Sequence, residues 1–157
     1  MRSFSLFVTY SQVAIFKASL ENPFNDWTES HIRQGFAWRP GSVSFQTIED
    51  GGTHAIEVVV EAGAVEISSQ ATRVIEVPFE VPDDRPVQIA SISDEVSIEI
   101  SPGRYTLRFE YIRSKNDGEP TIRLVFTPSG NPKFQIVRAD PELRPADQLI
   151  VTADPAV

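Results

Sequence analysis

The residues best suited to acid–base or metal chemistry are two histidines, His31 and His54, in a chain of 157 residues without cysteine. An imidazole exchanges a proton near neutral pH, and as a neutral ring it is a common zinc ligand. The sequence has no His-x-x-His or His-Glu-x-x-His spacing, no Gly-x-Ser-x-Gly elbow, no glycine-rich phosphate loop and no Walker-type lysine. We therefore expect both histidines to be surface or half-buried polar residues. We predict a protein that is not an enzyme and that holds neither a metal nor a cofactor.

Adjacent carboxylates occur at three predicted turns, Glu49-Asp50, Asp83-Asp84 and Asp94-Glu95. Paired acids can bind Ca²⁺ or serve a glycosidase. Asp is also favoured in turns because its side chain bonds to nearby backbone, and no Asp-x-Asp-x-Asp-Gly loop occurs. Solvated turns are the first interpretation, contact with a partner the second and metal binding the third. If a partner binds, we expect it to meet Asp83, Asp84, Asp94 and Glu95.

Three aromatic residues, Trp27, Phe36 and Trp38, lie close together in the sequence. Bulky side chains of this kind pack a helix over the open end of a β-sandwich, which is the first interpretation. Exposed tryptophans also anchor protein interfaces, and they stack on sugars. Trp27 and Trp38 are therefore candidate partner-binding residues. In an alternative function, a small-ligand or carbohydrate-binding sandwich, they would form the site together with nearby acids.

The net charge narrows the range of partners. Fourteen basic and twenty-two acidic residues give a formal charge of −8, with an isoelectric point near 4.7. This charge disfavours direct binding to a nucleic acid backbone. It favours encounter with a basic protein, such as a nuclease that must itself bind DNA. Solubility alone also explains an acidic composition, so charge by itself does not identify a partner.

Helix signals interrupt an otherwise strand-like sequence in the segment 26–45. Asp26 is placed to cap a short helix over about residues 27–34, with Glu29 three residues later reaching back to the cap amide. Gly35 then supplies a left-handed stop. The residues that follow, Gly-Ser-Val-Ser-Phe, return to a strand pattern.

Alternation of apolar and polar residues predicts strands along most of the chain. Inward faces are expected for the sets Phe4, Leu6, Val8, Tyr10; His54, Ile56, Val58, Val60; Arg73, Ile75, Val77, Phe79, Val81; Val96, Ile98, Ile100; Tyr105, Leu107, Phe109, Tyr111; and Ile122, Leu124, Phe126. Val13 and Ile15 continue the first set as a hairpin or a bent strand, and residues 134–137 form a shorter strand. Short strands joined by turns predict an all-β fold, an antiparallel β-sandwich of about 8–10 strands with one short helix.

Three finer predictions concern how these strands lie. The strand 95–100 is expected to pair with 104–111 as a hairpin, with Thr106, Arg108 and Glu110 facing outward. Pro78 cannot donate to a ladder, so it is expected at a sheet edge or a bulge. Asn116-Asp117-Gly118 is expected to form a loop.

The chain is expected to divide into a β-sandwich domain, residues 1–139, and an extended C-terminal arm, residues 140–157, that contains Pro141, Pro145 and Pro155. This arm would dock as a strand or remain partly disordered. No run of about 18 apolar residues occurs, so we expect no membrane span. With no leader pattern at the N-terminus and no cysteine, a cytoplasmic location is the expectation.

The segment Asp26-Trp27-Thr28-Glu29, with its flanking strands, resembles the competence protein J (ComJ) family. A second part of the likeness lies in Val77-Pro78-Phe79-Glu80-Val81, in residues 87–91 and in the Ser101-Pro102-Gly103-Arg104-Tyr105-Thr106-Leu107 stretch. It runs from about Phe4 to Tyr111. The resemblance implies a non-catalytic inhibitor of a DNA-entry nuclease of naturally competent bacteria, acting by covering the nuclease's basic substrate-binding surface with acidic loops. No family residue pattern assigns the contacts, and the oligomeric state stays open.

Overall fold

The structure is a computed structural model that describes residues 1–114 and 118–157. The predicted loop at Asn116-Asp117-Gly118 therefore lies, apart from Gly118, outside the described residues. The elements are β1 (Arg2–Val8), β2 (Gln12–Lys17), α1 (Glu29–Gln34), β3 (Phe36–Arg39), β4 (Ser42–Gln46), β5 (Gly52–Val60), β6 (Arg73–Val81), β7 (Val87–Ala90), β8 (Glu95–Ile98), β9 (Gly103–Ile112), β10 (Thr121–Pro128) and β11 (Gln135–Arg138).

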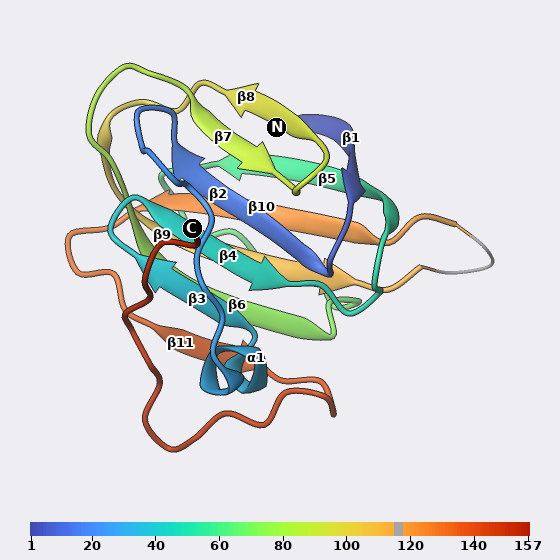
Figure 1. Ribbon diagram of the computed structural model, residues 1–157. Helices are drawn as coiled ribbons and strands as arrows, with labels where there is room; N and C mark the ends of the chain where they lie inside the picture. Colours follow the sequence, from blue (N-terminus) through green and yellow to red (C-terminus); the bar gives the residue numbers. More distant parts are fainter. Residues whose placement is uncertain (115–117) are drawn as a thin grey trace.

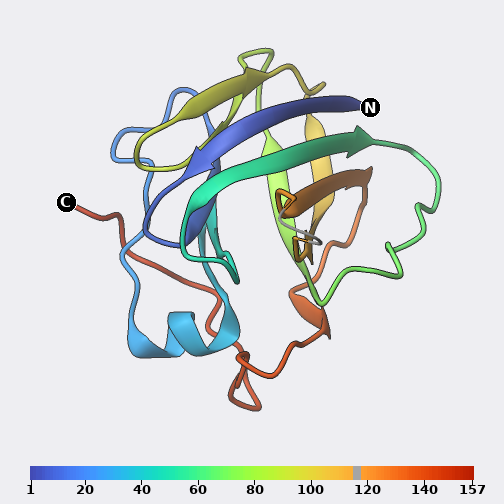
Figure 2. The ribbon, with the colours of Figure 1, turned by 90° about the vertical axis from the view of Figure 1, so that its right-hand side faces the viewer.

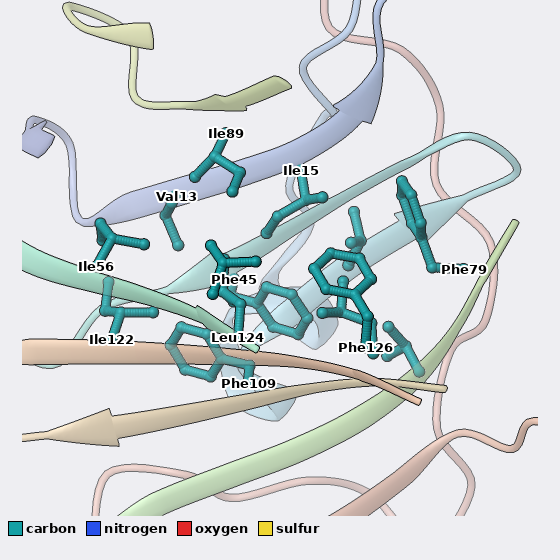
Figure 3. Close-up of a cluster of buried hydrophobic side chains, with 14 of the residues drawn as sticks. Val13, Ile15, Phe45, Ile56, Phe79, Ile89, Phe109, Ile122, Leu124 and Phe126 are labelled. Carbon is teal, nitrogen blue, oxygen red and sulfur yellow. The ribbon is translucent and has the colours of Figure 1, made fainter. Parts of the chain in front are cut away.

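Two sheets pack face to face, so the predicted all-β sandwich is confirmed (Figure 1). One sheet has the strand order β1-β5-β10-β9-β6-β11 and the other β3-β4-β2-β7-β8. Neighbouring strands in the described residues run antiparallel, except that β5 and β10 are parallel. The core between the sheets is apolar, and the rings of Phe45 and Phe109, one from each sheet, stack at 4.5 Å (Figure 3).

The predicted inward faces are largely confirmed. Leu107, Phe109 and Tyr111 are fully buried, and so are Ile122, Leu124 and Phe126 on β10. Arg108 and Glu110 lie on the outer face of the sheet, as predicted, but they are not exposed to solvent. Both are buried, because the loop between β5 and β6 covers the outer face of the sheet: Arg108 donates to the carbonyl of Val65 at 2.9 Å, and the amide of Ser68 donates to Glu110 at 3.0 Å.

The predicted hairpin of residues 95–100 with 104–111 does not form. β8 pairs with β7 in the five-stranded sheet, whereas β9 lies between β6 and β10 in the other sheet. The chain crosses from one sheet to the other between Ile98 and Gly103, where Gly103 adopts a φ of 155° that favours glycine. Strands that are neighbours in the sequence thus belong to opposite sheets, and the alternation of apolar and polar residues does not reveal this.

β1 and β2 also belong to opposite sheets, so they form neither a hairpin nor a single bent strand. Leu6 and Val8 point inward as expected, but Tyr10 lies in the turn after β1 and is 80% exposed. Val60, expected inward at the end of β5, is exposed as well. Pro78 lies where β11 has already ended, since β11 pairs with β6 only over residues 74–76, and this agrees with the predicted edge position.

The helix is capped by Thr28, not by Asp26 as predicted. The Thr28 hydroxyl accepts from the His31 amide, and the His31 ring accepts from the Thr28 amide, which completes a reciprocal capping box. Gly35 ends the helix in the left-handed conformation, as predicted, with a φ of 85°. A shorter helix is the result, because the first turn begins two residues later than the sequence pattern indicates.

The C-terminal segment, residues 140–157, runs in extended form beside α1 (Figure 2). The side-chain amide of Gln34 donates to the carbonyl of Ile150 and accepts from the Ile150 backbone N–H, and the His31 ring bonds to the carbonyl of Thr152. Leu143 packs so closely on Gly35 that a Cβ at that glycine would lie 2.8 Å from it. This segment therefore holds the helix at the side of the sandwich where the edge strands β3 and β11 lie.

Candidate functional site: an end of the sandwich built from three loops

Three connections meet at the end of the sandwich that lies on the right in Figure 1. They are residues 7–11, from the end of β1 through the turn into β2; residues 47–52, between β4 and β5; and residues 91–95, between β7 and β8. We call this region the three-loop end. The strands that lead into it belong to both sheets, so its loops extend from a fixed frame.

Hydrogen bonds join residues 7–11 to the β7–β8 turn. Asp94 accepts from the amide of Phe7 at 2.9 Å, and Ser91 donates its hydroxyl to the Phe7 carbonyl at 2.5 Å. The hydroxyls of Thr9 and Ser93 lie 3.3 Å apart. The edge of one sheet is thus tied to a turn of the other.

Residues 7–11 are joined in the same way to the β4–β5 connection. The Ser11 amide donates to the Asp50 carbonyl at 3.0 Å, and the Ser11 hydroxyl donates to an Asp50 carboxylate oxygen at 3.2 Å. The Thr47 amide in turn donates to the Ser11 carbonyl at 2.8 Å. These bonds hold the Tyr10-Ser11 turn in the left-handed region, with φ values of 58° and 54°.

Apolar side chains are exposed at this end. Phe7 is 50% exposed and Ile92 48%, beside Tyr10 at 80%. Tyr10 also lines a shallow hollow with Trp27 and with Ile32, an exposed residue of α1. Among the residues that the structure describes, Phe7 and Tyr10 are the aromatic side chains exposed to this extent.

The two acidic turns proposed from the sequence lie at opposite ends of the molecule, because β7 runs between them (Figure 1). Asp94 and Glu95 belong to the three-loop end. Asp83 and Asp84 lie at the far end, where Asp83 forms an ion pair with Arg85 at 2.7 Å. Hydrogen bonds from Arg85 hold the pKa of Asp83 below its usual value. The four acids therefore do not form one surface.

The two tryptophans are also separated. Trp27 donates its indole N–H to Gln12 at 3.2 Å beside the three-loop end. Trp38 donates to the carbonyl of Pro78 at 2.7 Å, and it lines a different hollow with Lys17 and Arg104 at the other end. Phe36 is fully buried in the core. The joint site that the alternative ligand-binding function requires of Trp27 and Trp38 is therefore not formed.

Both histidines are buried, which corrects the expectation that they lie at the surface or half-buried. His31 accepts at Nδ1 from the Thr28 amide, so Nε2 donates to Thr152 at 2.8 Å. His54 donates from Nδ1 to the carbonyl of Gly52, and its Nε2 accepts from the hydroxyl of Tyr111 at 2.8 Å. Both nitrogens of each ring are thus engaged in holding loops.

Burial also shifts the pKa of His54 and that of its partner Tyr111. It lowers the pKa of His54, against the opposing influence of the Gly52 carbonyl and of Glu49 and Glu119. It raises the pKa of Tyr111 to about 12. Within residues 1–114 and 118–157, His, Asp and Glu form no group of three or more arranged to hold a metal ion. Over the same residues, no helix is long and apolar enough to span a membrane.

Sequence reasoning missed Tyr10 and Ile92 as candidate site residues. Tyr10 extends the alternation of Phe4, Leu6 and Val8, and this placed it on an inward face. The signal that was available is Ser11-Gln12, a polar step that ends the alternation and allows a turn at Tyr10. Ile92 stands between two serines in a turn, a position where no core partner is expected.

Comparisons with known proteins agree with this architecture. The family model of competence protein J (ComJ) matches residues 5–127. Among solved structures, the chain is similar to ComJ of Bacillus subtilis, an inhibitor of the DNA-degrading activity of NucA, with a TM-score of 0.72 and 21% identity. The likeness covers 82% of this chain and 96% of that one. No curated protein matches the chain significantly. Because the family model matches most of its length, the chain belongs to the competence protein J (ComJ) family.

Proposed function

We propose that this protein is a non-catalytic inhibitor of a competence-associated, DNA-degrading nuclease. The observation that carries the proposal is the family match over residues 5–127, together with a shared fold that spans nearly all of an inhibitor of this kind. The sequence adds no arrangement of nucleophile and base that would favour turnover of its own.

The proposed mechanism is occlusion of the nuclease's DNA-binding surface. A nuclease must present cations to the phosphate backbone, and a protein with a formal charge of −8 is attracted to the same cations. The inhibitor itself is not attracted to DNA, so it competes with DNA for the nuclease and does not bind the DNA.

The test is an inhibition assay with the purified protein and the related nuclease of the source organism. We expect loss of DNA cleavage at a ratio near one inhibitor per nuclease, and a complex that isothermal titration calorimetry detects. The protein alone should leave DNA intact and unbound. Full cleavage in the presence of excess folded protein, with no heat of binding, contradicts the proposal.

A further inference from the structure

We propose that the three-loop end is the surface that contacts the nuclease, with Tyr10 as its central apolar anchor. This inference rests on the proposed function and adds the site to it. The partner is a protein face that presents an apolar side chain among cations.

Tyr10 is held in a conformation that its residue type disfavours. It and Ser11 are consecutive non-glycine residues with φ near 55°, a region that L-residues other than Asn and Asp seldom occupy. Such strain persists only where surrounding contacts enforce it, and it is concentrated at functional sites. Here the bonds of Ser11 to Asp50 and Thr47 enforce it, and the result is an aromatic ring that is 80% exposed.

The surroundings of Tyr10 have the composition of an interface centre. Trp27 and Ile32 share a hollow with it, and Phe7 and Ile92 are exposed on the segments bonded to each other beside it. Tyrosine and tryptophan dominate the binding energy of protein interfaces because they bury large areas with few rotatable bonds. The loops are already fixed, so little ordering is required on binding.

The acidic side chains of the three-loop end favour a basic partner. Asp50 stands on the β4–β5 connection, and Asp94 and Glu95 stand on the β7–β8 turn. Both oxygens of Asp94 accept backbone N–H groups, which fixes its carboxylate. The other apolar hollow, beside Trp38, carries Lys17 and Arg104, whose side chains form no ion pair within the described residues. Glu80 lines the same hollow, and Asp83 and Asp84 lie at the same end, so charge is mixed there. The two cations beside the apolar walls make this hollow less suited to a DNA-binding face than the three-loop end.

Two variants test the proposal, each with a matched control at the opposite end. Tyr10→Asn removes the anchor and places a residue that tolerates positive φ, so its stability should equal or exceed that of the wild type. Val60→Thr is its control, because Val60 is 45% exposed at the far end of β5. Glu95→Lys reverses an acid of the three-loop end, and Asp84→Lys makes the same change in net charge at the other end.

Affinity and association rate for the nuclease are measured by surface plasmon resonance, and stability by urea unfolding. We expect Tyr10→Asn to raise Kd by about 30-fold. Glu95→Lys should lower the association rate on the order of tenfold, with the loss reduced at high salt. Both controls should bind like the wild type. If Tyr10→Asn does not fold, Glu95→Lys and its control decide the question.

Two results overturn the inference while the proposed function stands. One is wild-type affinity in both Tyr10→Asn and Glu95→Lys, and the other is an equal loss in Asp84→Lys or Val60→Thr. Absence of binding by the wild-type protein overturns the proposed function, and the inference with it.

Discussion

At the scale of single residues, a series of linked hydrogen bonds lies beneath the three-loop end. His54 bonds to the Tyr111 hydroxyl at 2.8 Å, and that hydroxyl accepts from the Glu49 amide at 3.1 Å. The Glu49 carboxylate in turn accepts a hydrogen bond from the Ser114 hydroxyl at 3.0 Å. These bonds give partners to polar groups whose burial would otherwise cost free energy, and they fix the start of the β4–β5 connection.

This arrangement makes stability depend on pH through His54. Its folded pKa is lowered by burial, so the unfolded chain, with an ordinary value of 6.5, binds more protons at mildly acidic pH. The contribution of neutral His54 to the free energy of unfolding is complete above about pH 6.5. It is lost as the pH falls toward the pKa of His54 in the folded protein. At pH 5.5, one unit below 6.5, the loss is at most about 1.4 kcal/mol.

Urea unfolding of the wild type and of His54→Gln at pH 7.5 and pH 5.5 checks this prediction. The wild type should lose more free energy of unfolding than the variant between the two pH values, whatever their difference at pH 7.5. Equal losses in both proteins would show that His54 does not titrate differently in the folded and unfolded states.

At the scale of elements, the C-terminal segment is fastened by a buried ion pair. Arg73 on β6 contacts both carboxylate oxygens of Asp140, at 2.6 and 3.0 Å, and also donates to the carbonyl of Gln46. Both side chains are almost fully buried. Burial alone raises the pKa of Asp140, but the hydrogen bonds and charge of Arg73 outweigh it and hold that pKa below its usual value.

Removal of one partner should therefore cost much more than removal of both. Arg73→Met or Asp140→Leu alone leaves a buried charge without its partner, and each should lower the free energy of unfolding by about 3–5 kcal/mol. The double variant Arg73→Met/Asp140→Leu should be more stable than either single variant. Additive losses in chemical denaturation would mean that the two side chains do not act as a pair.

Sequence patterns predicted the faces of the strands better than their partners. The alternation of Tyr105, Leu107 and Phe109 identifies an inward face, because burial acts on every second residue wherever the strand pairs. The partner of that strand depends on the crossing near Gly103, which alternation does not encode. The burial of Arg108 and Glu110 on the outer face was missed for a related reason, since only the fold reveals that the β5–β6 loop covers them.

The candidate site was predictable in part. Glu95 and Trp27 were identified from residue type and sequence position, and both lie at or beside the three-loop end. The sequence did not show that Asp83 and Asp94 lie at opposite ends, because this requires knowing that β7 runs the length between them. Tyr10 was not found, since its exposure arises from the turn at Ser11 and from bonds to Asp50 and Thr47.

At the scale of the whole molecule, the two ends differ in shape and in the placement of charge. One end joins exposed aromatic residues to acids on two of its three bonded loops, and the other has a hollow lined by Lys17, Glu80 and Arg104. The C-terminal segment and α1 support the flank beside the first end. A rigid acidic protein of this form is suited to cover a basic surface without changing shape.

Competition with DNA tests this account most directly. The nuclease is first bound to a fluorescently labelled, non-cleavable DNA duplex, and the protein is then added while anisotropy and size-exclusion elution are followed. The account predicts that the DNA is released as the protein binds, and that no particle contains all three components. A stable complex of nuclease, DNA and this protein would contradict occlusion of the DNA-binding surface.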